Sequence, residues 1–211
     1  LAGLALARLY RPVAAQNRPN PDFLNSFFSI FNDSLLTDTL ARRDMYQYEG
    51  TEESTDICPM FFKPDYGIMH FVCVRTTAKA YRVLINFSVI KYLPRTKEYK
   101  FWTWDEYILS SYGIRRATET ANRRISRLPL RKMPQSKADT LAIPAGHEMF
   151  CPQEVKGDWL KVRYDCFYNQ PRNPHEGQPC QEYIDKCKTA TTGWLQWKQD
   201  NTVLIDIMLM P

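Results

Sequence analysis

The apolar and polar pattern of this chain predicts a helical segment followed by strands. Apolar residues recur at helical spacing over 22–42, and the pair Pro21-Asp22 supplies a helix start. They are Phe23, Leu24, Phe27, Phe28, Ile30, Phe31, Leu35 and Leu36. We therefore predict an amphipathic helix, followed by a polar loop, within an N-terminal region 22–55.

From Phe61 the pattern becomes the alternation of strands. The segments "GIMHFVCV", "AYRVLIN" and "SVIKYLP" predict three strands, and "FWTWDEYILSSYGI" contains a short helix. An aromatic content of 13% also favours strands over a helical bundle. We predict a β domain over 56–112.

A second run of strands begins near Leu128. In "GDWLKVRYD", Leu160, Val162 and Tyr164 alternate with Lys161 and Arg163, so Val162 is expected to point inward. The segment "GWLQWKQDNTVLIDIMLMP" closes the chain with further alternation. This run predicts a C-terminal β domain over 128–211, interrupted by a long insertion at 166–190.

Four short elements of this run resemble the bacterial SH3-like (SH3b) module. They are an arm from Lys132 to Ala138, Leu141 with Gly146, "GDWLKV" from Gly157 to Val162, and "GWL" from Gly193 to Leu195. The resemblance covers about 128–207 and implies a small SH3-like β-barrel, from which the insertion departs. As a whole, the chain resembles Bacteroidetes periplasmic proteins of unknown function that end in such a module.

A fainter repeat lies earlier in the chain. "KAYRVLIN" parallels "GDWLKVRYD", and "SVIKYLP" parallels "GWLQWK", although any antiparallel meander gives such alternation. If the parallel holds, 56–112 is a degenerate SH3-like repeat. The predicted fold class is mainly β with an N-terminal helix, a C-terminal SH3-like barrel and a second, degenerate SH3-like domain before it.

The net charge of +5 is mild, and dense basic sequence occurs between Gly113 and Lys132. Nucleic-acid binding and a solvated linker both fit such a stretch. We favour a basic linker at 113–127 and expect no nucleic-acid partner.

Six cysteines, an even number, indicate disulfides and an oxidising compartment. A zinc site is the competing interpretation, but no C-x-x-C spacing occurs and His70, His147 and His175 lie far apart. The disulfide candidates are Cys58, Cys73, Cys151, Cys166, Cys180 and Cys187. We expect Cys58 to pair with Cys73. Among three possible pairings of the other four, we favour one bridge within the insertion and one involving Cys151.

The first residues favour export. "LAGLALA" resembles the end of an apolar leader and Val13-Ala14-Ala15 a small-residue cleavage site, although a charged start is missing. We interpret 1–21 as a leader or an extended arm. No apolar run reaches the length of a membrane span, so the expected location is the periplasm or outside the cell.

Residues with catalytic potential do not form a recognisable set. His70 and Cys73 fall on opposite faces of one strand, and the adjacent pair Asp105-Glu106 suits the first turn of a helix. His175-Glu176 lacks the second histidine of a helical zinc motif. We expect no catalytic residue, metal or cofactor.

Aromatic residues of the C-terminal domain are the candidates for ligand contact. We predict Trp159, Tyr168 and Trp197 as ligand-binding residues and Trp194 as a core residue, while packing explains all of them equally well. The insertion is expected either to be a decoration or to display a recognition surface. Its members would be Phe167, Tyr168, Asn169, His175 and Tyr183.

These observations favour a non-catalytic exported binding or scaffolding protein of the bacterial envelope. SH3-like folds bind extended peptides in aromatic-lined grooves, so the expected partner is a peptide, peptidoglycan or an envelope protein. The alternatives are a structural assembly subunit and, less favoured, a divergent cell-wall hydrolase.

Overall fold

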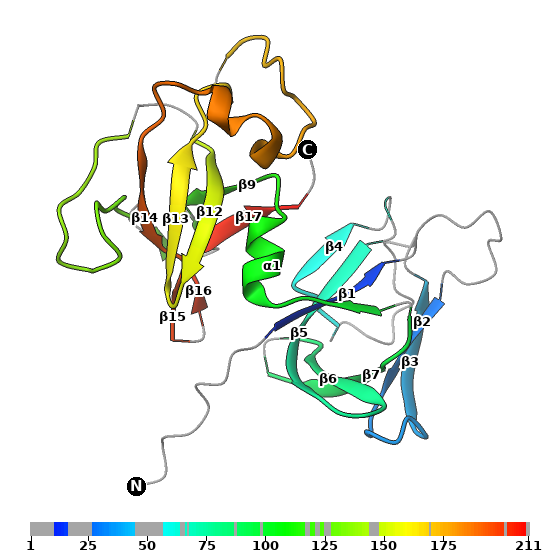
Figure 1. The fold of residues 1–211 in the computed structure, drawn as a ribbon. Coiled ribbons are helices and arrows are strands. Elements are labelled where there is room, and N and C mark those ends of the chain that lie inside the picture. Colours follow the sequence, from blue (N-terminus) through cyan, green and yellow to red (C-terminus); the bar gives the residue numbers. More distant parts are fainter. Residues whose placement is uncertain are drawn as a thin grey trace, which may run out of the picture. The chain divides into compact units, whose positions relative to one another are not determined.

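The chain folds into two compact units, Leu1–Trp104 and Asp105–Pro211, and both consist mainly of antiparallel strands (Figure 1). The fold is therefore mainly β, as the alternation predicts. The computed structural model describes residues 11–16, 27–44, 57–63, 66, 68–86, 88–97, 99–116, 119–120, 123–124, 128–143, 148–168, 170–200 and 202–209.

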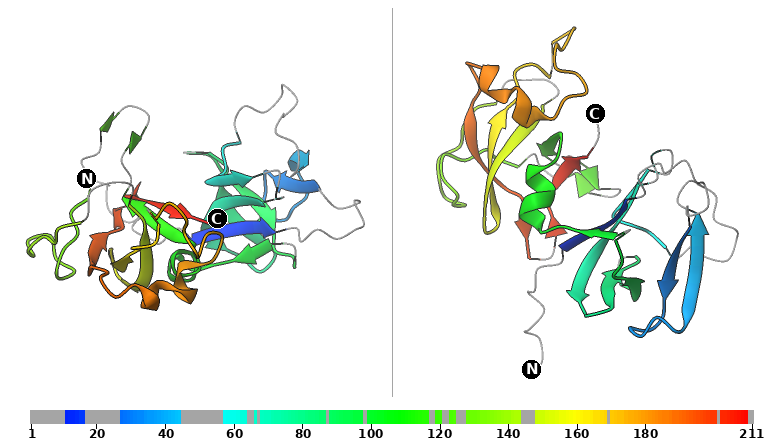
Figure 2. Two further views of the ribbon diagram at one scale, coloured as in Figure 1. Left: turned by 90° about the horizontal axis from the view of Figure 1, so that it is seen from above. Right: turned by 45° about the vertical axis from the view of Figure 1, so that its right-hand side comes forward.

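An eight-stranded antiparallel sheet makes up the first unit (Figures 1 and 2). Its strands are β1 (Arg11–Gln16), β2 (Phe27–Phe31), β3 (Thr39–Asp44), β4 (Phe61–Lys63), β5 (Ile68–Thr76), β6 (Ala80–Leu84), β7 (Ile90–Pro94) and β8 (Tyr99–Phe101). The order across the sheet is β3-β2-β7-β6-β5-β1-β8, and β4 also pairs with β5. The three strands predicted between 67 and 94 are confirmed as β5, β6 and β7.

One face of this sheet carries the core of the first unit. Alternate residues of the central strands enter it, because successive side chains of a strand point to opposite faces. The buried residues are Phe28, Ile30, Met69, Phe71, Cys73, Tyr81, Val83, Ile85, Leu93 and Tyr99. A bulge between Cys73 and Arg75 shifts the register there, so that Cys73 is buried while Arg75 is exposed.

The helix predicted over 22–42 is wrong for the described residues 27–42, which form β2, a turn and β3. The spacing of Phe27, Phe28, Ile30 and Phe31 satisfies a strand as well as a helix, and aromatic and β-branched residues favour the strand. Phe28 and Ile30 are buried and Phe27 is 50% exposed. The start of the predicted helix, 22–26, lies outside the described residues.

The turn after β2 is organised by the carboxylate of Asp33. It accepts hydrogen bonds from the backbone N–H groups of Asp38 (2.7 Å), Leu35 (2.7 Å) and Thr37 (3.1 Å). These bonds, led by the one from Asp38, hold the pKa of Asp33 below its ordinary value. Because the side chain takes up N–H groups that a helix would need, the chain reverses here.

Residue 56 is not a domain boundary. The sheet of the first unit includes β1, β2 and β3, which all precede residue 56. The segment 56–112 is therefore not a self-contained repeat of the second unit. Of the predicted leader or arm, 11–16 form β1, and 1–10 and 17–21 lie outside the described residues.

The second unit is built on a five-stranded antiparallel sheet (Figure 1). The short helix α1 (Trp104–Leu109), which the sequence predicts, precedes it. The strands are β9 (Gly113–Arg116), β12 (Phe150–Lys156), β13 (Trp159–Tyr164), β14 (Thr192–Gln196) and β17 (Ile205–Met208). The order is β14-β13-β12-β9-β17, so the last strand pairs with the first.

Four very short strands and two helical turns complete the second unit. Two two-stranded pairs are formed by β10 (Glu119–Thr120) with β11 (Arg123–Arg124) and by β15 (Lys198–Gln199) with β16 (Thr202–Val203). The helical turns are η3 (Cys180–Glu182) and η4 (Ile184–Lys186). Among the described strands no sheet closes into a barrel, so the predicted SH3-like barrel is not confirmed.

The segment predicted as a basic linker, 113–127, begins with a strand of the sheet. Arg116 of β9 is mostly buried and forms a bidentate ion pair with the buried Glu148. A further guanidinium nitrogen donates to the carbonyl oxygen of Leu128 at 2.7 Å. The charge of Arg116 therefore does not indicate solvation, since the carboxylate of Glu148, distant in sequence, neutralises it.

An arm over 128–143 covers the outer edge of β14. Backbone hydrogen bonds of 2.8 Å run in both directions between Arg131 and Trp194, and Leu130 is buried. The approach is so close that a Cβ atom at Gly193 would lie 2.7 Å from Leu130 Cγ and 2.8 Å from the carbonyl oxygen of Arg131. Glycine is required here because the arm occupies the space of a side chain.

We expect Gly193→Ala to lower the free energy of unfolding by about 1–3 kcal/mol, because the added methyl group must displace backbone as well as the Leu130 side chain. Urea unfolding followed by tryptophan fluorescence measures the change. Gly157→Asn is the matched control: Gly157 has φ +60° with open space around it, and asparagine tolerates that conformation. Equal stability of Gly193→Ala and the wild type would contradict the close approach.

Candidate functional site

The two faces of strand β13 point to the core and to the surface of the second unit. Leu160, Val162 and Tyr164 are buried, as the alternation predicts for Val162. Trp159 and Lys161 are half-buried on the opposite face. The inner side chains fill the core, so the outer ones are available for contact with another molecule.

Cross-strand pairing gathers aromatic and basic residues on this outer face. Lys161 lies opposite Trp194 of β14, and Trp159 lies opposite Gln196. Arg131 of the arm pairs with Trp194 from the other side. The two tryptophans are therefore diagonal neighbours, within reach of each other's large side chains. We call Trp159, Lys161, Trp194, Gln196 and Arg131 the tryptophan face.

Positive charge predominates on the tryptophan face. The ammonium of Lys161 lies 4.0 Å from the carboxylate of Glu154, and the two side chains are 40% and 53% exposed, so this ion pair is weak. One guanidinium nitrogen of Arg131 donates to the carbonyl oxygen of Ala138 at 2.7 Å, while its Nε is buried without an acceptor among the described residues. Lys161 is thus able to exchange Glu154 for a carboxylate of a ligand.

Two of the tryptophan predictions are wrong because the alternate residues at the end of the chain that face inward are not the ones that the predictions require. Trp197, predicted to contact ligand, is 1% exposed, and its indole N–H donates to the carbonyl oxygen of Gly157 at 3.0 Å. Leu195 is buried on the same side, whereas Trp194, predicted as core, is half-buried on the outer face. The prediction that Leu195 and Trp197 share a side is confirmed.

Tyr168, the third predicted ligand residue, is half-buried and bound to the first strand of the sheet. The guanidinium of Arg115 in β9 donates a hydrogen bond to its hydroxyl oxygen and lies 5.4 Å from its ring centroid. Of the three predicted ligand residues, Trp159 alone belongs to the tryptophan face.

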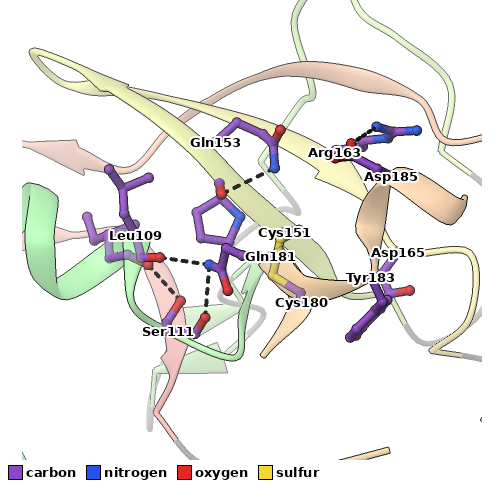
Figure 3. Close-up of a disulfide and its surroundings, with 12 residues drawn as sticks. Leu109, Ser111, Cys151, Gln153, Arg163, Asp165, Cys180, Gln181, Tyr183 and Asp185 are labelled. Carbon is purple, nitrogen blue, oxygen red and sulfur yellow. Dashed lines mark hydrogen bonds and ion pairs between the residues drawn. A yellow bond between two sulfur atoms is a disulfide. The ribbon is translucent and has the colours of Figure 1, made fainter. Parts of the chain in front are cut away.

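The four cysteines of the second unit form two disulfides, and the structure selects one of the three pairings that the sequence leaves open. Cys166 is bonded to Cys187 within the insertion, and Cys151 of β12 is bonded to Cys180 (Figure 3). The pairing of Cys58 with Cys73 is wrong, and neither residue is disulfide-bonded. Cys58 is exposed, whereas Cys73 is buried in the core of the first unit, with its thiol 3.4 Å from the carbonyl oxygen of Arg75.

The insertion has a small core of its own. Cys151, Cys180, Tyr183, Ile184 and Cys187 are buried together, and Phe167 packs against them. The hydroxyl of Tyr183 donates to the buried carboxylate of Asp165 at 2.7 Å. Burial first, and then this carboxylate, raise the pKa of Tyr183.

The predicted recognition surface on the insertion is therefore largely a packing cluster. The ring of His175 stacks on Tyr183 at 4.5 Å and meets Phe167 edge-on at 4.9 Å. Tyr183 is buried and Phe167 half-buried. Asn169 lies outside the described residues.

Polar contacts hold the insertion at two further points (Figure 3). The side-chain amide of Gln181 donates to the carbonyl oxygens of Leu109 at the end of α1 (2.7 Å) and of Ser111 (3.2 Å). The guanidinium of Arg163 binds the Asp185 carboxylate at 2.9 Å and donates to the Cys187 carbonyl at 2.6 Å. Since Arg163 shares the outer side of β13 with Lys161, the insertion borders the tryptophan face.

The residues considered for catalysis do not come together. His70 and Cys73 lie on opposite faces of β5: Cys73 enters the core, whereas His70 packs between Phe61 (5.3 Å) and Trp102 (5.8 Å). Across the described ranges, no group of three or more His, Cys, Asp or Glu side chains is placed to hold a metal ion. In the same ranges no helix has the length and apolar character needed to cross a membrane.

Fold and site together define a two-unit, mainly β protein with a disulfide-bonded insertion beside an aromatic surface. Comparisons with protein-family models, curated proteins and solved structures give no match to this chain. The site is therefore interpreted from its own residues.

Sequence reasoning missed Trp194 and Arg131 as surface partners. The mixed apolar pattern of "GWLQW" does not say which alternate set faces inward.

The disulfide assignment predicts a specific thiol count. Under native conditions a small alkylating reagent should modify Cys58, the exposed thiol, and spare the buried Cys73; in denaturant without reductant it should modify both and no others. Peptide mass mapping identifies the labelled residues. Replacing Cys151 and Cys180 by alanine should lower the free energy of unfolding by about 3–4 kcal/mol, because the bridge closes a loop of 29 residues. Labelling of Cys166 or Cys187 in unreduced protein would contradict the assignment.

The buried imidazole of His70 predicts a pH dependence of stability. Burial lowers the pKa of His70 from 6.5 to about 4. Between these pH values the imidazole of His70 is protonated in the unfolded chain and neutral in the folded chain. Stability is full above pH 6.5 and falls as pH approaches 4, by about 3 kcal/mol in total. Denaturant unfolding across this range measures the slope, and His70→Phe should flatten it. An unchanged slope in this variant would assign the effect to other groups.

Proposed function

We propose that this chain is a non-catalytic exported binding or scaffolding protein of the bacterial cell envelope. Its ligand, a peptide, peptidoglycan or an envelope protein, binds at the tryptophan face. One observation carries this proposal: Trp159 and Trp194 are diagonal neighbours on the outer face of a sheet whose inner face is already filled by Leu160, Val162 and Leu195. Neither tryptophan is needed to complete that core.

The chemistry of the face suits an extended ligand with apolar and carboxylate groups. Trp side chains provide large, rigid contact area and dominate many binding surfaces. Lys161 lies opposite Trp194 and two residues along β13 from Trp159, and its ion pair with Glu154 is exposed and weak. A stem peptide of peptidoglycan, which combines small apolar side chains with carboxylates, has both features.

The resemblance to SH3-like modules supports a binding role. Five short antiparallel strands, with β17 returning to β9 and the arm lying along β14, are compatible with such a module that carries an insertion. SH3-like folds bind extended peptides in aromatic-lined grooves. The likeness to Bacteroidetes periplasmic proteins belongs to the same proposal.

Two further observations favour an exported, non-catalytic protein. The bonds Cys151–Cys180 and Cys166–Cys187 persist in oxidising compartments, such as the periplasm and the outside of the cell. The candidate nucleophile Cys73 is buried in a core, and His70 lies on the other face of its strand. Nucleophilic cysteines are usually partly exposed in electropositive surroundings, whereas Cys73 is buried.

A structural assembly subunit is the second candidate. The hairpin of β2 and β3 exposes Leu35 (70%), Phe27 (50%) and Leu40 (42%). Exposed apolar side chains grouped on one hairpin are typical of contacts between subunits. In that case the ligand of the second unit would be a neighbouring subunit rather than peptidoglycan.

Co-sedimentation with purified peptidoglycan tests the proposal. We expect saturable binding by the wild type and at least about tenfold weaker binding by Trp159→Ala and by Trp194→Ala, because a central tryptophan of an interface contributes about 2 kcal/mol or more. Tyr66→Ala is the matched control, since it removes a 59% exposed aromatic ring from the first unit.

Circular dichroism melting separates loss of contact from loss of fold. Both tryptophan variants should melt near the wild type, since neither ring is a core residue. Saturable binding that survives both substitutions would exclude the tryptophan face. No binding by the wild type would remove peptidoglycan from the proposal and favour the assembly subunit.

A further inference from the structure

A row of four side chains crosses the sheet of the first unit on the face opposite its core. The register places Phe31 of β2 beside Tyr92 of β7, Tyr92 beside Arg82 of β6, and Arg82 beside Arg75 of β5. Directly paired residues share a face, so the four form one continuous line. We call Phe31, Tyr92, Arg82 and Arg75 the arginine row.

The two arginines of this row oppose each other without a carboxylate. Like charges placed directly across two strands are destabilising. Among the described residues no acidic side chain forms an ion pair with Arg75 or Arg82, and Nε of Arg82 is buried without a hydrogen-bond acceptor. A buried donor left without an acceptor costs stability. An anionic group bound between the guanidinium groups removes both penalties.

The surroundings of the row are also basic. The guanidinium of Arg42 in β3 lies 4.7 Å from the ring centroid of the half-exposed Phe27, on the same face as Phe31. Between residues 57 and 104 the sequence has eight lysines and arginines but two acidic residues. An acidic partner would complement the charge of Arg42, Arg75 and Arg82.

The neighbouring row defines which kind of acidic partner fits. Ile90, Leu84 and Val72 pair across β7, β6 and β5 beside the arginine row, and all three are half-buried. These aliphatic side chains offer contact to apolar groups but no hydrogen bonds to sugar hydroxyls or nucleobases. An anionic polymer without apolar groups would use only half of this surface.

We propose that this face of the first unit binds an extended acidic segment of a protein partner. Its carboxylates would accept bidentate hydrogen bonds from Arg75 and Arg82, and its apolar side chains would pack on Tyr92, Leu84 and Ile90. The site lies in the first unit and is independent of the tryptophan face. The chain thus has two binding surfaces with different chemistry.

Fluorescence anisotropy with defined probes tests this site on the full chain. The binding probe is a short fluorescein-labelled peptide that alternates glutamate with valine. A peptide alternating glutamine with valine, labelled oligothymidine and labelled polyphosphate are the comparison probes. We expect the glutamate peptide to bind best, and its affinity to fall with added salt.

The variant Arg75→Gln/Arg82→Gln should bind the glutamate peptide about tenfold or more weakly, since it removes two charge-assisted contacts. Its melting temperature should equal or exceed that of the wild type, because the repulsion between the arginines disappears. Lys186→Gln/Lys188→Gln, which removes the same charge from exposed lysines of the second unit, is the control and should bind normally. Trp159→Ala should also leave this affinity unchanged, which separates this test from that of the proposed function.

Three results would overturn the proposal. The first is absence of binding of the glutamate peptide to the wild type. The second is equal or tighter binding of oligothymidine or polyphosphate, which would assign the face to nucleic acid or to a phosphate polymer. The third is a lower melting temperature of the double arginine variant with unchanged peptide affinity, which would mean that the arginines hold another part of the same chain.

Discussion

The register of β13 between β12 and β14 is the constraint on which the second unit depends. Side chains of a strand alternate between two faces, so a shift by one residue would exchange Leu160 and Val162 for Trp159 and Lys161 in the core. The tight turn at Gly157, with φ +60°, fixes the register on one side. The arm over Gly193 fixes it on the other, because the pairing of Arg131 with Trp194 fits only one position of β14. The same register therefore determines which residues form the core and which form the tryptophan face.

The insertion is held to this sheet by bonds of different kinds. A disulfide joins it to β12 at Cys151, an ion pair joins it to β13 at Arg163, and the amide of Gln181 joins it to the end of α1. Its core around Tyr183 and Cys187 is too small to be stable alone. Covalent and polar attachment replaces the buried apolar area that so short a segment lacks. The insertion therefore forms a fixed border to the tryptophan face.

Much of the β architecture could be predicted from the sequence, because its signals are local. Alternation located β5, β6, β7, β13 and β14, and the even cysteine count indicated disulfides without specifying which cysteines pair. The errors arise where a local sequence pattern is compatible with two different structures. The spacing of Phe27, Phe28, Ile30 and Phe31 fits helix and strand, and the hydrogen bonds that select the strand come from the Asp33 turn and from β7.

The site could be predicted only in part for the same reason. Trp194 and Trp197 are three residues apart, so they lie on opposite faces, and both are large apolar side chains. Distant partners decide between them: Gly157 accepts the indole N–H of Trp197, and Arg131 pairs with Trp194. Likewise the charge of Arg116 indicates a linker when only its neighbours in sequence are considered, whereas in the fold it forms an ion pair with Glu148. Contacts between residues far apart in sequence carry this information.

The pairing of β9 with β17 determines how the second unit responds to mechanical force. Gly113, where β9 begins, lies opposite Met208, where β17 ends. A pull on the two ends of the unit therefore opens this pair like a zipper, one hydrogen-bonded pair after another, rather than shearing all of them at once. The chain between Cys151 and Cys187 is crossed by two covalent bonds and extends only partly. Tension would thus detach β17 first and leave the bonded insertion, and the strand that carries Trp159, as the last structured part.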